Sequence, residues 1–196
     1  NRTITKMATD FDQAMFDIEL DYWGIPKRKY SKLEIDLADI FNKTPAMNNF
    51  PEQTLQQWKA LKPFDLKGYM DDGLIELDLY KEIGKIEVPN VITWHGQTDL
   101  QEAHGVGRGT GGFGIFEGEY AKGIPHGYGR LILRTRNVYE GQFFNGTITG
   151  RGDFTIFRSG KIISGLWNNS VLNKSDHHDN EEGTRIIENV APESIY

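Results

Sequence analysis

The N-terminal part of the chain places its apolar residues at helical spacing. In the first such stretch these residues are Phe11, Met15, Ile18 and Tyr22, which would share one face of a helix. Thr9 and Asp12 resemble a capping box at its start, and Gly24-Ile25-Pro26 marks its end. The pattern therefore predicts a helix that begins near Thr9 and ends before Gly24.

A second helix is predicted after Ser31, which forms a capping box with Glu34. Its apolar face would consist of Leu33, Leu37, Ile40 and Phe41. The alternation of Leu33, Ile35 and Leu37 also suits a strand, and we favour the helix. Thr44-Pro45 would end it.

A third short helix is predicted from Phe50-Pro51-Glu52 through Leu55, Trp58 and Leu61, and Pro63 ends it. Between Phe64 and Thr93 the pattern weakens. The ranges 73–79 and 86–92 could form short strands that lead into a sheet, but no firm interpretation of this segment follows.

The middle of the chain alternates and repeats itself. Residues 116–120 (FEGEY) return as 139–143 (YEGQF) and, in part, as 163–167 (ISGLW). A second landmark follows the first at a fixed offset, in the ranges 126–129 (HGYG) and 149–152 (TGRG). A weaker earlier copy keeps these offsets, with Trp94-His95-Gly96 followed by His104-Gly105-Val106-Gly107. The period of about two dozen residues is typical of repeat architectures.

Alternation predicts that each repeat is a β-hairpin with two different faces, because successive strand side chains point to opposite sides. One face would carry aromatic rings that lie over the glycines of a neighbouring strand. We predict that these rings bind a partner, because so long an aromatic row exceeds what isolated soluble proteins leave uncovered. The predicted partner-binding residues are Trp94, Phe116, Tyr120, Tyr139, Phe143 and Trp167.

The opposite face is predicted to be solvated and to form cross-strand charge pairs. Its acidic residues are Glu117, Glu119 and Glu140, and its basic residues are Arg130, Arg134 and Arg151. The joints contain the Gly, Pro and Asn that tight turns need, as in Asn145-Gly146-Thr147.

These motifs resemble the MORN repeat, with about three copies and a partial one in residues 94–170. The range 116–138 matches throughout, Thr149 stands where the second copy would have His, and the copy at Trp94 lacks the Glu and the second aromatic residue. The predicted helices and the repeated hairpins together indicate an α+β protein in which helices precede an elongated antiparallel sheet of stacked hairpins. We expect three regions: a mainly helical part at 1–93, the MORN sheet at 94–172 and an acidic, extended C-terminal arm at 173–196.

Composition adds limits to this picture. The 196 residues include 22 glycines, which the repeat accounts for, and no cysteine, which excludes disulfides and thiolate chemistry. The net charge of −6 is divided into −4 before residue 94, +2 in the repeat block and −4 after residue 172. No concentrated basic face is evident, so we predict no nucleic-acid partner. The chain begins at Asn1, and a targeting segment could have preceded it.

No catalytic constellation emerges, so we predict a protein that is not an enzyme and has no cofactor. The range 109–114 satisfies the Gly-x-Gly-x-x-Gly pattern, but strand rather than helix follows it, which argues for a hairpin loop. His177-His178 on a polar segment offers no fixed metal geometry.

The resemblance implies a structural or accessory subunit of a large eukaryotic assembly, a scaffold whose partners are other protein subunits. We expect an intracellular location in a cytoskeletal, ciliary or organellar assembly, for example a mitochondrial one. The alternatives are a phosphoinositide-binding membrane module and a regulatory part of an enzyme complex. Any membrane contact would not involve a transmembrane segment, because no apolar run approaches the ~18 residues that a span requires.

Overall fold

The computed structural model describes residues 32–45, 51–89 and 91–175. The chain divides into two compact units, Asn1–Ile35 and Asp36–Tyr196, and every contact given below lies within the second. The helix predicted from Thr9 and most of the predicted C-terminal arm lie outside the described residues.

Three helices precede the sheet within the described residues. They are α2 (Lys32–Asn42), α3 (Glu52–Ala60) and α4 (Leu66–Asp71). The first two confirm the predicted helices, and the alternative strand at Leu33–Leu37 is wrong. The short α4 was not predicted; the Asp65 carboxylate accepts a 3.0 Å hydrogen bond from the Gly68 N–H and caps its start.

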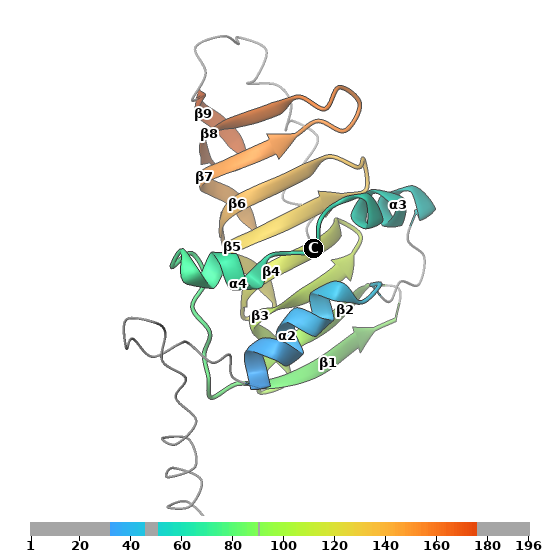
Figure 1. The fold of residues 1–196 in the computed structure, drawn as a ribbon, viewed down its shortest axis with the longest axis vertical. Coiled ribbons are helices and arrows are strands. Elements are labelled where there is room, and N and C mark those ends of the chain that lie inside the picture. Colours follow the sequence, from blue (N-terminus) through green and yellow to red (C-terminus); the bar gives the residue numbers. More distant parts are fainter. Residues whose placement is uncertain (1–31, 46–50, 90, 176–196) are drawn as a thin grey trace, which may run out of the picture. The chain divides into compact units, whose positions relative to one another are not determined.

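Nine antiparallel strands then form one open sheet in sequence order, so every hairpin pairs with the next (Figure 1). They are β1 (Glu82–Val88), β2 (Ile92–Asp99), β3 (Glu102–Gly111), β4 (Gly114–Ala121), β5 (Ile124–Leu133), β6 (Val138–Phe144), β7 (Thr147–Thr155), β8 (Ile162–Asn168) and β9 (Val171–Ser175). This is the predicted α+β class and hairpin sheet. The two tentative strands are wrong, since 73–79 contains no strand and 86–92 spans the turn between β1 and β2.

Four two-residue turns at one end of the strands set the hairpin geometry. Both residues of each turn have positive φ, as in Lys122-Gly123 and Asn145-Gly146, which matches the right-handed twist of paired strands. The turns also join successive repeats. Gly123 N–H donates to the Ala103 carbonyl, Gly146 to Pro125 and Ser170 to Ile148, each at 2.9 Å. Stacking of the hairpins is therefore fixed by backbone bonds as well as by side chains.

A row of glycines crosses the first eight strands at a single register position. Its members are Gly84, Gly96, Gly107, Gly118, Gly129, Gly141, Gly152 and Gly165. A Cβ built on Gly129 would lie 2.4 Å from the Phe116 ring, and one on Gly152 would lie 2.3 Å from the Tyr139 hydroxyl. Each ring thus covers a glycine of the neighbouring strand, as predicted, and also the glycine two residues ahead on its own strand.

Each of the three full repeats contains a bulge that a side chain closes. Gln97, Glu119 and Gln142 each accept a hydrogen bond from the backbone N–H nine residues later, at 2.9, 2.7 and 3.2 Å. The residue before each donor is a glycine with φ between +63° and +103°, a conformation that costs glycine least. In each Gly-x-Gly landmark the first glycine therefore lies at the bulge. The second glycine is covered by the aromatic ring of the preceding strand.

Candidate interaction surface

The six aromatic residues predicted to bind a partner form the core of the sheet. Their side chains are at most 3% exposed. Tilted and edge-on contacts connect their rings, with centroids 4.3 Å apart for Trp94 and Tyr120, 4.9 Å for Phe116 and Phe143, and 5.9 Å for Tyr139 and Trp167. The expectation that this row stays exposed is wrong, because the rings cover one another and the glycines. Partner binding by these six residues stays a prediction, and their burial gives it no support.

The opposite, charged face was predicted to be solvated, and this is wrong for its central strands. Glu117 is fully buried, and Arg108 and Arg130 are each 5% exposed. All three occupy one row across β3, β4 and β5. Helices α2, α3 and α4 lie in front of this face in Figure 1, with Trp58 and Leu61 packed on Ile115, Ile132 and Val138.

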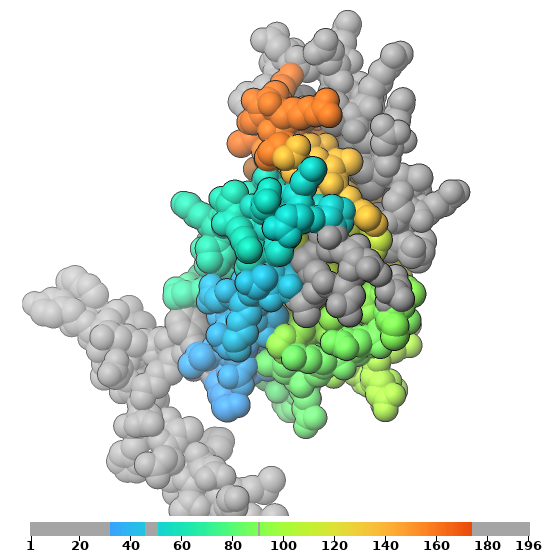
Figure 2. Space-filling model, turned by 90° about the vertical axis from the view of Figure 1, so that its right-hand side faces the viewer, coloured from blue at the N-terminus to red at the C-terminus, as the bar shows by residue number. Residues whose placement is uncertain are grey.

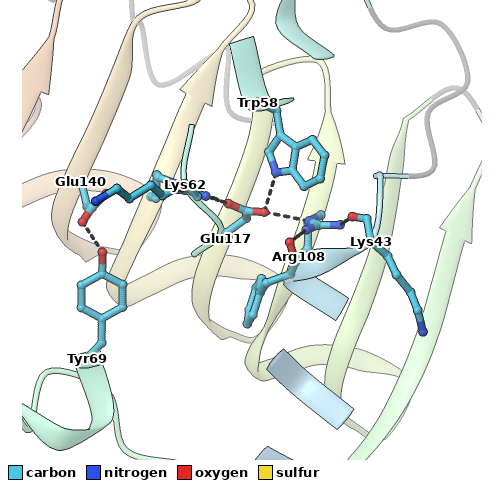
Figure 3. A network of polar contacts seen from close by, with 9 residues as sticks. Lys43, Trp58, Lys62, Tyr69, Arg108, Glu117 and Glu140 are labelled. Carbon is cyan, nitrogen blue, oxygen red and sulfur yellow. Dashed lines mark hydrogen bonds and ion pairs between the residues drawn. The ribbon is translucent and has the colours of Figure 1, made fainter. Parts of the chain in front are cut away.

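The buried carboxylate joins the two arginines to the helix layer (Figure 3). Glu117 Oε1 accepts from Arg108 Nε at 2.9 Å and from the Trp58 indole N–H at 2.8 Å. Glu117 Oε2 accepts from Arg130 Nε at 3.1 Å and Nη2 at 2.5 Å. The Glu117–Arg130 pair confirms one predicted cross-strand charge pair. Burial lowers the pKa of Arg108, and the Glu117 carboxylate opposes that shift.

The same arginines bind the carbonyl ends of the helices. Arg108 Nη1 and Nη2 donate to the carbonyls of Lys43 and Phe41 at 2.6 and 2.7 Å, where α2 ends. Arg130 Nη1 donates to the Lys62 carbonyl at 2.9 Å, just after α3. The last carbonyls of a helix lack partners within it and carry partial negative charge, which suits a guanidinium. Arg108 thus holds the C-terminal end of α2 to the sheet, and Arg130 holds the connection that follows α3.

A chain of aromatic rings completes the helix layer. Phe41, Phe64, Tyr69 and Tyr128 contact one another in that order, each pair with centroids 4.9 Å apart. The Tyr69 hydroxyl donates to the Glu140 carboxylate. Burial and this bond raise the pKa of Tyr69, and burial beside Glu140 and Asp153 raises the pKa of Tyr128 to about 12. Both phenols therefore stay neutral and act as structural groups.

Beyond Tyr69 and Glu140 the charged face is open. The apolar row Ile115, Ile132 and Val138 continues through Thr155 to Ile162, and Ile162 is 57% exposed. Leu166 on β8 is 43% exposed and Phe144 on β6 is 57% exposed. On β7, the exposed Arg151 lies opposite Leu166, and the exposed Asp153 lies opposite Ser164. We call Phe144, Asp153, Ile162 and Leu166 the open platform. None of the described helices lies in front of β7–β9 (Figure 1).

The described residues contain no cluster of side chains suited to a metal ion. No group of three His, Asp or Glu side chains within them could hold a metal ion, and His177-His178 lies outside them. The Gly-rich range 109–114 forms the end of β3, a turn and the first residue of β4, so it is the predicted hairpin loop. A search of the same residues finds no helix of the length and hydropathy needed to cross a membrane.

An open antiparallel sheet built from one recurring hairpin defines a β-repeat protein. The family model of the MORN repeat matches residues 116–138 and 139–156. The chain therefore contains MORN repeats. The glycine row continues with the same geometry into the hairpins on either side of the matched range. MORN repeats are generally non-catalytic modules for interaction with proteins or membranes.

Sequence reasoning missed the residues that join helices and sheet. Arg108 has the same place in its repeat as Arg130, directly after the second glycine of the landmark. That repeat phase could have identified it. Trp58 and Tyr69 carry no comparable signal, because their polar atoms bond to residues that lie 59 and 71 positions away in the chain.

Proposed function

We propose that this protein is a non-catalytic structural or accessory subunit of a larger protein assembly, and that it binds a partner protein through the open platform. One observation carries the proposal. The face that α3 covers on the central strands continues onto β7 and β8 with the same apolar row, and there it exposes Ile162 and Leu166. Exposed apolar side chains grouped on one face are typical of interaction sites.

The platform suits an amphipathic helix from the partner. On the neighbouring strands α3 places Trp58 and Leu61 on the apolar row, and a partner helix placed beside it would find Thr155 and Ile162 in that row. Asp153 would favour a basic residue on the helix beside its apolar stripe. Phe144 supplies a large ring at the rim, and aromatic residues are enriched in interfaces.

MORN repeats are interaction modules, which supports this function. We further propose that the assembly is a large eukaryotic one, cytoskeletal, ciliary or organellar. A phosphoinositide site on the platform has less support, because an anionic headgroup favours several Lys or Arg on one face, and here Arg151 lies beside Asp153 on β7.

The test compares Leu166→Glu with Leu79→Glu, a change at a leucine that is 66% exposed and lies before β1. Both tagged chains are expressed in the source cells and purified with whatever remains bound. A charge in an apolar contact should cost more than ~1.4 kcal/mol, which is tenfold in affinity. We expect Leu166→Glu to reduce the stoichiometric partner at least tenfold, and Leu79→Glu to retain it.

Thermal unfolding of both purified variants provides the control, because exposed substitutions usually change stability by less than about 0.5 kcal/mol. Equal retention of the partner by the two variants would overturn the proposed surface. Absence of any stoichiometric partner from the unsubstituted chain would overturn the proposed function.

A further inference from the structure

Four cations gather on two adjacent turns at the end of the sheet opposite the two-residue turns. Arg134 and Arg136 lie on the β5–β6 turn, and Arg158 and Lys161 lie on the β7–β8 turn. Figure 2 views this end of the sheet, with the β7–β8 turn in orange beside the gold β5–β6 turn and above the teal α3. We call these four residues the basic turn cluster.

Side-chain contacts hold the two turns together. The Asn137 side-chain oxygen accepts a 3.0 Å hydrogen bond from the Phe157 N–H, and the Arg136 guanidinium lies 3.9 Å from the Phe157 ring centroid. Arg134, Arg158 and Lys161 are exposed. Within the described part of the chain no carboxylate forms an ion pair with any of the four cations. The cluster is therefore a group of four positive charges with which no carboxylate of the described residues forms an ion pair.

The last strand directs the chain toward this cluster. β9 is antiparallel to β8, and its last residue Ser175 pairs with Gly165. Continuing in the direction of β9 leads back along β8 toward Lys161, four residues before Gly165. At ~3.3 Å per residue this is a path of roughly 13 Å, which a segment of a few residues covers.

The segment that follows carries the complementary charge. Residues 176–182 (DHHDNEE) contain Asp176, Asp179, Glu181 and Glu182, four carboxylates for the four cations of the cluster. We propose that segment 176–182 binds the basic turn cluster within the same chain. Exposed ion pairs are individually weak, but a short tether gives the segment an effective concentration in the millimolar range. The contact should depend strongly on salt, because the Debye length falls from ~10 Å at 0.1 M to ~3 Å at 1 M.

The absence of cysteine makes a direct test available. Asn180→Cys in the full chain receives a nitroxide spin label, and NMR of the isotope-labelled protein reports which backbone amides the label broadens. At low salt we expect strong broadening at Arg158 and Lys161. Lys122 and Gly123, in the turn at the opposite end of the strands, serve as the control and should keep their intensity. The broadening should fall at least severalfold at about 1 M salt.

A second variant separates charge from other causes of contact. It replaces the four carboxylates of segment 176–182 by Asn or Gln and keeps the label, and we expect it to lose the broadening at Arg158 and Lys161. Broadening that persists in this variant or at high salt would overturn the proposal, as would equal broadening at both ends of the strands or none at all.

Other occupants of the cluster are distinguished in the same system. In a mixture, one set of chains carries the spin label and a second set carries only the isotope label. Broadening of amides in the isotope-labelled chains would assign the contact to a second copy and overturn the proposal.

For a membrane surface the probe is a vesicle containing phosphatidylserine. Residues 1–175 should bind it more tightly than the full chain, since the segment would compete. Equal binding by the two chains would show that the segment leaves the cluster unoccupied.

Discussion

At the residue scale, one position in each full repeat closes the bulge, and its chemistry varies. Gln97 and Gln142 are neutral, whereas Glu119 can ionise. Burial raises the pKa of Glu119 above its ordinary value of 4.5, although the Tyr128 N–H opposes the shift by stabilising the carboxylate. The amide of glutamine offers the same acceptor oxygen and has no charge to desolvate.

Glu119→Gln should therefore stabilise the protein at neutral pH. Because the folded-state pKa is raised, the contribution of Glu119 to stability is complete below its unfolded-state pKa and declines as pH rises through the folded value. The variant avoids this decline. Thermal midpoints measured from pH 3.5 to 7 should coincide at the acid end and diverge above it, with the variant higher. A gap that stays constant with pH, or that favours the natural chain at pH 7, would contradict this argument.

At the element scale, the helices and the sheet are joined by buried charge rather than by apolar contact alone. The single carboxylate of Glu117 pairs with both Arg108, which binds the end of α2, and Arg130, which binds the connection that follows α3. The arginine side chains also lie against rings, with the Arg108 guanidinium carbon 5.0 Å from the Trp58 ring centroid. Removing one member of such a group leaves the others desolvated and unpaired.

Glu117→Gln should destabilise the protein by ~3–5 kcal/mol, the usual cost of breaking a buried ion pair from one side. Hydrogen exchange should quicken at the amides of both α2 and α3, because both arginines lose their counter-charge. The amides of β8 should change least. Glu87→Gln on the exposed edge strand β1 is the matched control and should have a small effect. Loss of protection confined to one helix would show that the carboxylate does not couple the two.

The sequence allowed the strands to be predicted but not the layer that covers them. Alternation, the repeat phase and turn residues such as Asn145-Gly146 are local signals, and the sheet follows them. The solvated charged face was predicted because isolated Glu and Arg positions usually face water. Arg108, Glu117 and Arg130 are instead covered together by the helix layer, and their hydrogen bonds to that layer join residues 59 to 68 positions apart in the chain.

The two elements directly before and at the start of the sheet, α4 and β1, also could not be predicted from the sequence. α4 is a six-residue helix capped by Asp65, too short for a clear apolar period. β1 is an edge strand whose seven residues alternate weakly between exposed and half-buried. Neither element has a strong hydrophobic pattern, so tertiary contacts with Tyr128 and β2 decide their place.

At the scale of the whole molecule, the two faces of the sheet have different structural roles. The aromatic face is closed by its own rings and glycines and forms the core. The charged face holds α2, α3 and α4 on the central strands and leaves the open platform on β6–β8. The central claim is therefore that partners bind the charged side of the sheet and leave the aromatic rings in place.

Hydroxyl-radical footprinting of the chain, free and bound to its stoichiometric partner, tests this claim most directly. In the free chain Tyr80, which is 98% exposed, and Phe144 should react quickly, while Phe116 and Tyr139, both fully buried, should react slowly. Binding should protect Phe144 and Leu166 and leave Tyr80 unchanged. Rapid reaction of Phe116 and Tyr139 in the free chain, followed by their protection in the complex, would contradict the account.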